Sequence, residues 1–457
     1  MKHILNTTLA LLLVTSAGIV SVSAQNPVIQ TIYTADPASM VYNDTVYLYT
    51  GHDEDSSTWF TMKDWHVFST TDMVNWTDLG SPLSVSTFSW AKKDAWAGQC
   101  TFRNGKFYWY VPVNQANGKG MAIGVAVSDR PVGPFTDALG KPLVHSGPGD
   151  IDPTVFINDD GQAYLYWGNP YLKYVKLNDD MISWNKEVGI VNVPLTKEGF
   201  GVRYKDPKRS TEYEEGPWLY KRKGLYYLIY PAGGVPEHLA YSTSNSPAGP
   251  WVYQDTIMPV IGEGGAFTNH PGIIDYKGKS FLFYHNGALP GGGGFDRSVC
   301  VEEFKYNKDS TIPRIKNTTV GVVHPVGHLN PYILNQAETI AWEKGVEISS
   351  GKDRIYVKDI NNGDYIKVRS VNFRKGAKSF ETNAASGSNG GTISIRLDNP
   401  EGKLAGTCKI THTGGWQSWK VLQAKFEKIN GIHDVYFVFN GGEGNLFNFD
   451  SWKFNKK

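Results

Sequence analysis

The sequence predicts an all-β protein in which a five-bladed β-propeller is followed by a β-sandwich of the jelly-roll type. A turn-and-strand segment recurs five times over residues 27–325, and this repeat is lost after Val326. Composition agrees, because 14 Trp, 25 Tyr, 21 Phe and 49 Gly residues favour short aromatic strands and tight turns over helices. At 457 residues the chain also exceeds the usual size of one hydrophobic core.

Residues 1–24 are expected to form a signal peptide rather than part of either domain. Lys2 and His3 precede an apolar run over residues 9–22, and small residues lead up to Gln25. The run is short and interrupted, which favours a signal peptide over a transmembrane anchor. We therefore expect cleavage near Ala24, a secreted or periplasmic protein, and no insertion into a membrane.

The propeller is expected to occupy residues 25–326. In each copy of the repeat, a turn rich in Gly, Asn or Asp leads into an aromatic or β-branched strand, which is typical of hairpins. The copies recur at intervals of roughly 55 to 60 residues, within the range of propeller blades; they lie at 43–49, 104–110, 160–166, 223–230 and 277–284. A second motif predicts an outer strand, a turn and a buried aromatic side chain; it lies at 69–76, 128–135 and 242–251.

The remaining residues, 327–457, are expected to form the separate β-sandwich. Several of their segments alternate or run apolar between Gly and Asn turns, as sandwich strands do. These segments are 364–368, 392–397, 419–422 and 433–439.

Charge and cysteine content narrow the possible partners. Lys and Arg total 45 against 44 Asp and Glu, so there is no electrostatic reason to expect nucleic acid or an anionic membrane, and a neutral partner fits better. Cys100, Cys300 and Cys408 are too scattered for a disulfide framework or a spaced metal site, and we expect them to be small buried residues.

Three acidic residues precede innermost strands of different predicted blades. They are Asp36 in Ala35-Asp36-Pro37, Asp152 in Asp150-Ile151-Asp152-Pro153 and Glu215 in Glu214-Glu215-Gly216-Pro217. Innermost strands surround the central channel, so these side chains should converge on one pocket. A lone Asp-Pro is typical of a turn, but three acids in register with a repeat suit glycosidic hydrolysis, which needs a carboxylic acid and a carboxylate. Pro after Asp36 and Asp152 should hold both acids in extended geometry.

These three motifs resemble the signature of glycoside hydrolase family 43, an inverting family of five-bladed propellers. The resemblance implies that Asp36 is the general base, Glu215 the general acid, and Asp152 the residue that tunes the pKa and orientation of Glu215. A neighbouring carboxylate keeps the proton of Glu215 available near neutral pH. Inversion implies roughly 6.5 to 9.5 Å between the base and acid carboxyl groups.

Residues 94–99 resemble the arabinoxylan arabinofuranohydrolase branch of that family. Trp96 could stack on a sugar or be a core aromatic between blades. Arg297 matches a substrate-side arginine of the family, with a surface salt bridge as the alternative. His270 matches a position on the propeller axis that often contacts a metal or water, so structural calcium is expected there. No organic cofactor is expected.

Residues 335–452 resemble carbohydrate-binding module family 6. The resemblance implies a calcium site at Glu338 and Asp450, and a sugar cleft at Trp416 and Asn448. Asp359 stands where the family usually has an aromatic residue, so one wall of that cleft is missing. The module could bind elsewhere or only brace the propeller.

Together these features predict an inverting hydrolase that releases α-L-arabinofuranosyl side chains from arabinoxylan. A β-xylosidase or a xylanase-type enzyme acting on the xylan backbone is the nearest alternative, because pocket shape decides between pentosides. A non-catalytic carbohydrate-binding protein is the alternative from another class. The expected partner is a plant-type polysaccharide such as arabinoxylan or xylan oligosaccharides, and the protein is expected to be a monomer.

Overall fold

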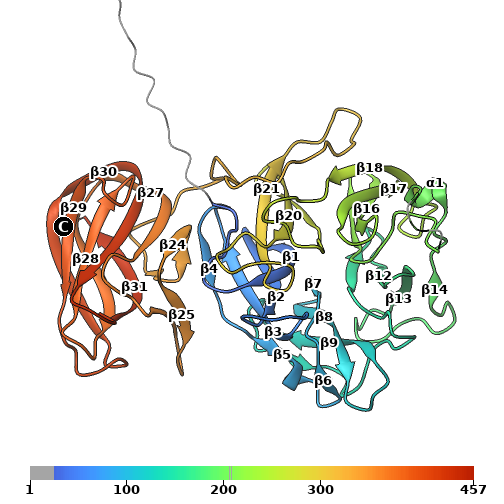
Figure 1. The fold of residues 1–457 in the computed structure, drawn as a ribbon, viewed down its shortest axis with the longest axis horizontal. Helices are drawn as coiled ribbons and strands as arrows, with labels where there is room; N and C mark the ends of the chain where they lie inside the picture. Colours follow the sequence, from blue (N-terminus) through green and yellow to red (C-terminus); the bar gives the residue numbers. More distant parts are fainter. Residues whose placement is uncertain (1–24, 205, 207, 457) are drawn as a thin grey trace, which may run out of the picture.

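The computed structural model describes residues 25–204, 206 and 208–456, and the predicted fold class is confirmed (Figure 1). A ring of five β-sheets is followed by a curled β-sheet domain at the C-terminal end. Within the described residues helix is limited to α1 (Lys197–Phe200) and the 3-10 turn η1 (Val85–Thr87). None of the described helices is long and apolar enough to cross a membrane. The expected signal peptide, residues 1–24, lies outside the described residues.

Each of the five sheets in the ring is an antiparallel blade. The first blade contains β1 (Thr34–Tyr42), β2 (Thr45–Asp53), β3 (Met62–Thr70), β4 (Trp76–Asp78) and β5 (Leu83–Ser84). The second contains β6 (Ala91–Lys93), β7 (Gln99–Arg103), β8 (Lys106–Gln115), β9 (Met121–Ser128) and β10 (Thr136–Asp137). The third contains β11 (Thr154–Ile157), β12 (Ala163–Trp167), β13 (Lys173–Leu177) and β14 (Val191–Asn192). The fourth contains β15 (Trp218–Arg222), β16 (Leu225–Ala232), β17 (His238–Ser244) and β18 (Val252–Met258), and the fifth β19 (Gly272–Tyr276), β20 (Lys279–Asn286) and β21 (Ser298–Phe304).

The predicted repeat forms the strand that pairs with the innermost strand of every blade; these strands are β2, β8, β12, β16 and β20. These strands are buried on both faces because neighbouring blades pack against them, which explains their aromatic and aliphatic runs. The second motif supplies the predicted buried aromatics, Trp76, Phe135 and Trp251, at 2%, 4% and 6% exposure. Each such side chain removes roughly 150–250 Å² from water, so these aromatics help to hold the blades together.

The start of the described chain closes the ring. The fifth blade has only three strands, and residues 25–34 run alongside β21. The Val28 amide donates to the Val299 carbonyl at 2.8 Å, and the Thr34 amide donates to the Arg297 carbonyl at 2.9 Å. The two ends of the propeller sequence are thereby joined, and the otherwise exposed edge of the last blade is paired.

The C-terminal domain is one hydrogen-bonded sheet that curls around its own core. The strands of this sheet are β22 (Asn335–Gln336), β24 (Trp342–Lys344), β25 (Glu347–Ser350), β26 (Ile355–Lys358), β27 (Tyr365–Ala385), β28 (Gly391–Leu397), β29 (Leu404–Ile410), β30 (Lys420–Gly441) and β31 (Asn448–Asn455), while β23 (Thr339–Ile340) lies outside it. The main order is β25-β26-β31-β27-β30-β28-β29. The long strands β27 and β30 pair with several register shifts between Val368 and Ser379, as expected where a strand bends. The enclosed core includes Phe380, Phe437 and Trp452.

The C-terminal domain also adds a strand to the propeller. β23 pairs with β4, with Thr339 opposite Thr77 and Ile340 opposite Trp76. Beside it, the Arg369 amide donates to the Asn75 side chain at 2.7 Å. The two domains therefore share a sheet, which braces one against the other.

The three cysteines are free and buried, as predicted. Cys100 and Cys300 lie in the propeller core, and Cys408 lies in the core of the C-terminal domain. Burial raises the pKa of each thiol, so none is suited to nucleophilic chemistry.

Candidate active site

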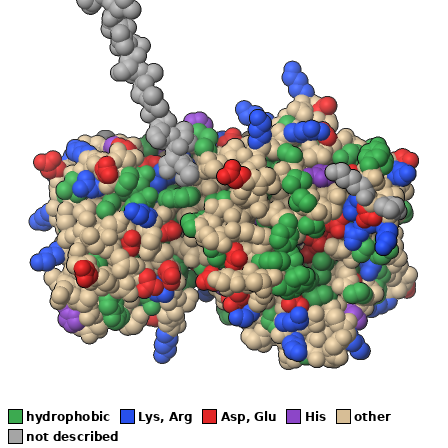
Figure 2. All heavy atoms as spheres, viewed as in Figure 1, with side chains coloured by type: hydrophobic (Ala, Val, Ile, Leu, Met, Phe, Trp, Pro, Cys, Tyr) green, Lys and Arg blue, Asp and Glu red, His purple; other side chains and the backbone are tan. Residues whose placement is uncertain are grey.

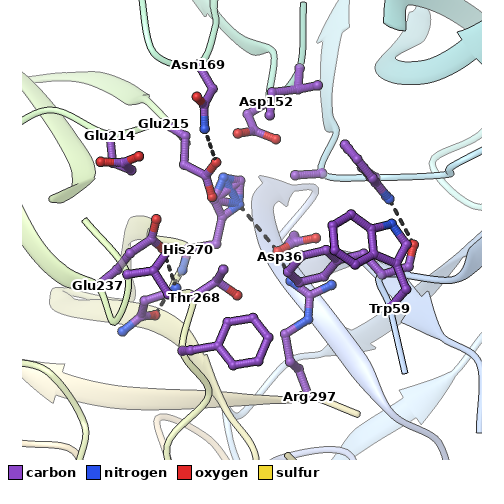
Figure 3. A pocket seen from close by; sticks show the side chains of 17 residues that line it. Asp36, Trp59, Asp152, Asn169, Glu214, Glu215, Glu237, Thr268, His270 and Arg297 are labelled. Carbon is purple, nitrogen blue, oxygen red and sulfur yellow. Dashed lines mark hydrogen bonds and ion pairs between the residues drawn. The ribbon is translucent and has the colours of Figure 1, made fainter. Parts of the chain in front are cut away.

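A pocket of about 320 Å³ opens in the middle of the propeller. Figure 2 shows acidic side chains gathered there among hydrophobic ones. The pocket lies over the ends of the innermost strands, so its lining comes from all five blades. Its polar lining includes Asp36, Asp152, Asn169, Glu215, Glu237 and Arg297 (Figure 3).

The structure brings the three predicted acids together in this pocket. Asp152 and Glu215 precede β11 and β15, as predicted, whereas Asp36 lies inside β1, at an irregularity between Ala35 and Ala38. Directly beneath them, a narrow cavity on the axis is lined by one motif from each blade; the motifs are Asp36-Pro37, Ala97-Gly98, Asp152-Pro153, the Pro217-Trp218 pair and His270-Pro271.

The expected extended geometry of the two Asp-Pro acids is wrong. Asp36 has a φ of 53° and Asp152 a φ of 58°, both in the left-handed region. Aspartate tolerates this region better than most residues, and strain of this kind gathers at functional sites. Tertiary contacts outweigh the local preference, since the Asp36 amide donates to His285 Nδ1 at 3.2 Å and Asp152 Oδ2 accepts the Gly216 amide at 3.1 Å.

Arg297 fixes Asp36 from one side of the pocket. Its Nη1 donates to Asp36 Oδ1 at 3.0 Å, while Nε and Nη2 each donate to the Asp53 carboxylate at 2.8 Å. Burial lowers the pKa of Arg297, but Asp36 and Asp53 outweigh burial and raise it above its usual value. Arg297 is 3% exposed, so the alternative of a surface salt bridge is wrong.

Two histidines complete the surroundings of Asp36. His285 is fully buried, and its Nε2 lies 3.0 Å from the Thr268 carbonyl, which makes Nε2–H the donor and leaves Nδ1 to accept from Asp36. Burial, Arg297 and His270 lower the pKa of His285 well below its usual value, so this ring is neutral. His270 lies between Asp36 and Glu215 in Figure 3, with Nδ1 3.8 Å from Asp36 Oδ1.

The two adjacent glutamates have opposite surroundings. Glu214 is paired with Arg203, at 2.7 Å, and with Arg209. Glu215 has no cationic partner among the described residues; its Oε2 accepts one hydrogen bond, from Asn169 Nδ2 at 2.6 Å. Burial, opposed by Asn169 and assisted by the charges of Glu214 and Asp36, raises the pKa of Glu215 to about 7. Glu215 can therefore hold a proton near neutral pH, whereas Glu214 is held as a structural ion pair.

Asp152 is 6% exposed and lies close to both other acids. Burial, then Glu215 and Asp36, raise the pKa of Asp152 well above its usual range. Its hydrogen bond from the Gly216 amide ties it to the residue that follows Glu215. Asp150, two residues earlier, instead accepts hydrogen bonds from Trp167 and Ser146 and holds the loop.

Aromatic side chains form the apolar wall. Trp96 lines the pocket and is also packed into the wall, since its Nε1 donates to the Phe60 carbonyl at 3.0 Å. Phe60 contacts Phe267 and Phe295 with ring centroids 5.9 and 4.9 Å apart. Trp59 stands at the rim and is 56% exposed. The pocket thus joins an aromatic wall to a polar end.

Several pocket residues were not predicted from the sequence. Asn169, Glu237 and Thr268 line the pocket, whereas Asp53 and His285 are fully buried and bind the pocket residues Arg297 and Asp36. Asp53 ends β2 and Asn169 follows β12, positions at which the upper ends of blade strands meet the pocket. A polar residue at the end of a strand is the only sequence feature that could have indicated them. Such residues are also common in ordinary turns, so this feature does not distinguish a pocket residue from a turn residue.

In the C-terminal domain, Trp416 and Asn448 lie together. Trp416 is 40% exposed, and Asn448 Nδ2 donates to its carbonyl at 2.8 Å. Asp359 pairs with Lys358 at 2.6 Å and accepts from Asn445 at 2.9 Å. The position usually held by an aromatic residue is thus occupied by a charged pair, which offers no stacking face.

Glu338 and Asp450 line one cavity beside the propeller, together with Asp78 from β4. Glu338 Oε2 is buried without a partner, and burial, Asp78 and Asp450 raise the pKa of Glu338 to about 9. Asp450 accepts hydrogen bonds from Arg354 and Asn383. An unpartnered carboxylate oxygen among other oxygens fits a hard cation.

The propeller axis was the other expected calcium position. His270 Nε2 is buried and has no partner among the described residues, while the carboxylates of Asp36 and Asp152 line the same axial cavity. One nitrogen with carboxylate oxygens is compatible with calcium. Elsewhere in the described chain, His52, Asp64 and His66 cluster on β2 and β3, where ion pairs of 2.9 and 3.5 Å join them.

Comparison with known proteins gives the family. The family model described as Glycosyl hydrolases family 43 matches residues 24–312, and the one described as Carbohydrate binding module (family 6) matches residues 336–456. An arabinoxylan arabinofuranohydrolase of Bacillus subtilis (strain 168) is 34% identical, over 94% of this chain and 92% of that protein.

Two solved structures extend the comparison. A family 43 arabinoxylan arabinofuranohydrolase from Bacillus subtilis, in complex with cellotetraose, is 32% identical with a TM-score of 0.81, covering 95% of this chain and 98% of that one. A family 43 β-xylosidase/α-arabinofuranosidase from a compost microbial metagenome, solved with xylotriose in a calcium-free form, is 30% identical with a TM-score of 0.57, covering 64% and 98%. The chain therefore belongs to glycoside hydrolase family 43, a family of inverting glycosidases, and carries a family 6 carbohydrate-binding module.

Proposed function

We propose that this glycosidase releases α-L-arabinofuranosyl side chains from arabinoxylan. The observation that carries the proposal is the pocket on the propeller axis, in which a proton-holding Glu215 and an Arg297-bound Asp36 lie on different walls. The names of the relative and of the solved structure that match nearly the whole chain support the choice of substrate.

In the proposed reaction, Asp36 is the general base and Glu215 the general acid. Asp36 takes a proton from water as the water oxygen attacks the anomeric carbon, and the glycosidic bond breaks as Glu215 gives its proton to the leaving oxygen. One water is consumed, and the configuration at the anomeric carbon inverts. Arg297 holds the Asp36 carboxylate in place, and Asp152 orients Glu215 through the Gly216 amide.

A β-xylosidase or xylanase-type activity on the xylan backbone is the second candidate. The relative solved with xylotriose combines xylosidase and arabinofuranosidase in its name, and one set of acids serves both pentosides. A purely carbohydrate-binding role is disfavoured, because all three acids are present in the pocket and two of them have different surroundings. The pKa of Glu215 is raised, whereas Asp36 is bound by Arg297.

Calcium is proposed at two places. His270 would hold it on the axis, and Glu338 and Asp450 would hold it beside the C-terminal domain. Bound there, calcium would supply positive charge that offsets the crowded carboxylates. The calcium-free label on one relative's structure supports calcium in the family.

The C-terminal module is proposed to keep the enzyme near its polysaccharide. Trp416 offers an exposed ring beside Asn448, but Asp359 removes the facing aromatic, so binding there should be weak. A secreted or periplasmic monomer acting on plant-type polysaccharide completes the proposal.

Product analysis tests the substrate directly. The protein is incubated separately with arabinoxylan, unbranched xylan and linear arabinan, and the released sugars are separated by chromatography. Free arabinose from arabinoxylan alone supports the debranching function. Xylose or xylo-oligosaccharides from unbranched xylan would transfer the assignment to the second candidate, and no product from any of the three would overturn both.

A further inference from the structure

Glu237 lies in the wall of the pocket, but the proposed reaction gives it no role. It immediately precedes β17 and is 3% exposed. It lines the same pocket as Asp36, Asp152 and Glu215. Figure 3 shows its carboxyl group on the Glu215 side of the pocket, near His270 and Thr268.

The contacts of Glu237 leave one of its oxygens available. Oε2 accepts the Asn269 amide at 2.8 Å, and the Glu237 amide donates to the Phe267 carbonyl at 3.0 Å, so the residue is fixed at both ends. Among the described residues, Oε1 has no hydrogen-bond partner and Glu237 has no ion-pair partner. Glu214, by contrast, is neutralised by two arginines. A carboxyl oxygen that lines a pocket and has no partner in the protein is available to hydrogen-bond a bound molecule.

We propose that Glu237 is a substrate-binding residue that hydrogen-bonds a hydroxyl group of the pentosyl unit in the pocket. The inference rests on the proposed function and deepens it. Neutral pentoses offer only hydroxyl groups and ring faces for recognition, and the aromatic wall already serves the faces. A carboxyl group bonds a hydroxyl in either protonation state, because it accepts when ionised and also donates when protonated.

This contact would select for an unsubstituted hydroxyl. A site built to hydrogen-bond a substrate hydroxyl disfavours the analogue that lacks it, because the buried protein group is then left unpaired. Leaving a buried hydrogen-bonding group unpaired corresponds to a factor on the order of 10 to 100 in kcat/KM. An ester or second sugar on that hydroxyl would also be excluded, which favours terminal, unmodified pentosyl units.

A structural role is the competing explanation. Through the Asn269 amide, Glu237 could serve only to place the loop that carries His270. Loss of that role would slow every substrate by the same factor, because the defect would not involve any particular hydroxyl group.

The test uses 4-nitrophenyl α-L-arabinofuranoside, its 2-, 3- and 5-deoxy analogues, and the corresponding β-D-xyloside series. The full-length wild type, Glu237→Ala and Glu237→Gln are compared by kcat/KM, with Glu302→Gln as a control for altering a buried glutamate on β21. With wild type and with Glu302→Gln, we expect kcat/KM for one deoxy analogue to be about 10- to 100-fold lower than kcat/KM for the parent substrate. For Glu237→Ala, kcat/KM on the parent substrate should fall below the wild-type value by a similar factor. The same variant should cleave that deoxy analogue almost as fast as it cleaves the parent substrate.

Glu237→Gln covers the case in which the alanine variant fails to fold, since its amide can still accept from Asn269. With its oxygen held by Asn269, the glutamine presents an NH2 group that cannot accept from a substrate hydroxyl, so its discrimination against the same analogue should be clearly smaller than that of wild type. Equal losses of the variants on all analogues would overturn the proposal and leave the glycosidase function standing. If wild type cleaves neither parent pentoside, the proposed function and this inference both fall.

Discussion

Arg297 joins Asp36 to Asp53, a residue from the end of a different strand. The guanidinium donates to Asp36 Oδ1 at 3.0 Å and makes a two-pronged contact with Asp53 at 2.8 Å per bond. Asp53 is fully buried, so the proposed base is positioned through a buried chain of charges rather than by its own backbone.

Replacing Asp53 with Ala should damage both stability and activity. The substitution leaves the Arg297 charge buried with one partner fewer, and breaking a buried ion pair costs about 3–5 kcal/mol. Denaturant unfolding and kcat/KM measure the two effects. Asp255→Asn, which breaks the exposed pair with Arg314, is the control and should change unfolding by less than about 1 kcal/mol. An Asp53→Ala protein as stable as this control would contradict the proposed role of Asp53 as a buried partner of Arg297.

Asp36→Ala and Glu215→Ala should be separable by the leaving group. In each variant, kcat on xylan-derived substrates should fall on the order of 10²- to 10⁴-fold. With a 2,4-dinitrophenyl pentoside the leaving group needs no protonation, so Glu215→Ala should recover much of its activity and Asp36→Ala should not. If both variants recover equally, the assigned roles of acid and base are wrong. Retained binding to insoluble arabinoxylan checks that the C-terminal module is intact.

The kcat/KM of the enzyme should decrease as the pH rises through about 7. Glu215 donates only while protonated, and its pKa of about 7 means that this fraction declines as pH rises through that value. The Asn169 hydrogen bond favours the ionised form and lowers the pKa of Glu215. Asn169→Ala should therefore move the alkaline limb of kcat/KM to higher pH. A limb that stays in place, or moves to lower pH, would show that another group controls it.

Gly216→Ala should disturb the acid directly. Gly216 has a φ of 50°, and a Cβ there would lie 2.4 Å from the His270 ring. We expect loss of about 1–3 kcal/mol of stability and a large fall in kcat. Gly224→Ala is the matched control, since its φ is 82° but a Cβ would meet nothing within 4 Å. Equal kcat values for the two variants would mean that the close contact with His270 is unimportant.

Calcium should raise the unfolding temperature of protein treated first with a chelator. Binding to the folded state at 100 times Kd stabilises by about 2.7 kcal/mol. Glu338→Gln should remove the part of this effect that belongs to the C-terminal domain, whereas Glu347→Gln, an exposed glutamate of the same domain, should not. Calorimetry with and without calcium makes the comparison, and identical shifts in the two variants would exclude Glu338 as a ligand.

Local sequence determined the architecture of the protein. The turn-and-aromatic-strand repeat predicted β2, β8, β12, β16 and β20, because hairpin turns and strand composition depend on neighbouring residues. The same repeat placed Asp36, Asp152 and Glu215 at the channel, since the start of an innermost strand has one location in a propeller, although Asp36 lies just inside β1 rather than before it.

Only the tertiary structure decided how those acids are prepared for chemistry. Asp36 and Asp152 adopt left-handed backbone geometry against the preference of a residue before proline, because His285 and the Gly216 amide bind them. Glu214 and Glu215 are neighbours of the same type, and only the loop carrying Arg203 separates a structural ion pair from a residue that can hold a proton. Contacts between residues such as Asp53 and Arg297, 244 positions apart, leave no periodic trace in the chain. Burial and charge arise from what surrounds a side chain, and those surroundings exist only once the five blades have closed.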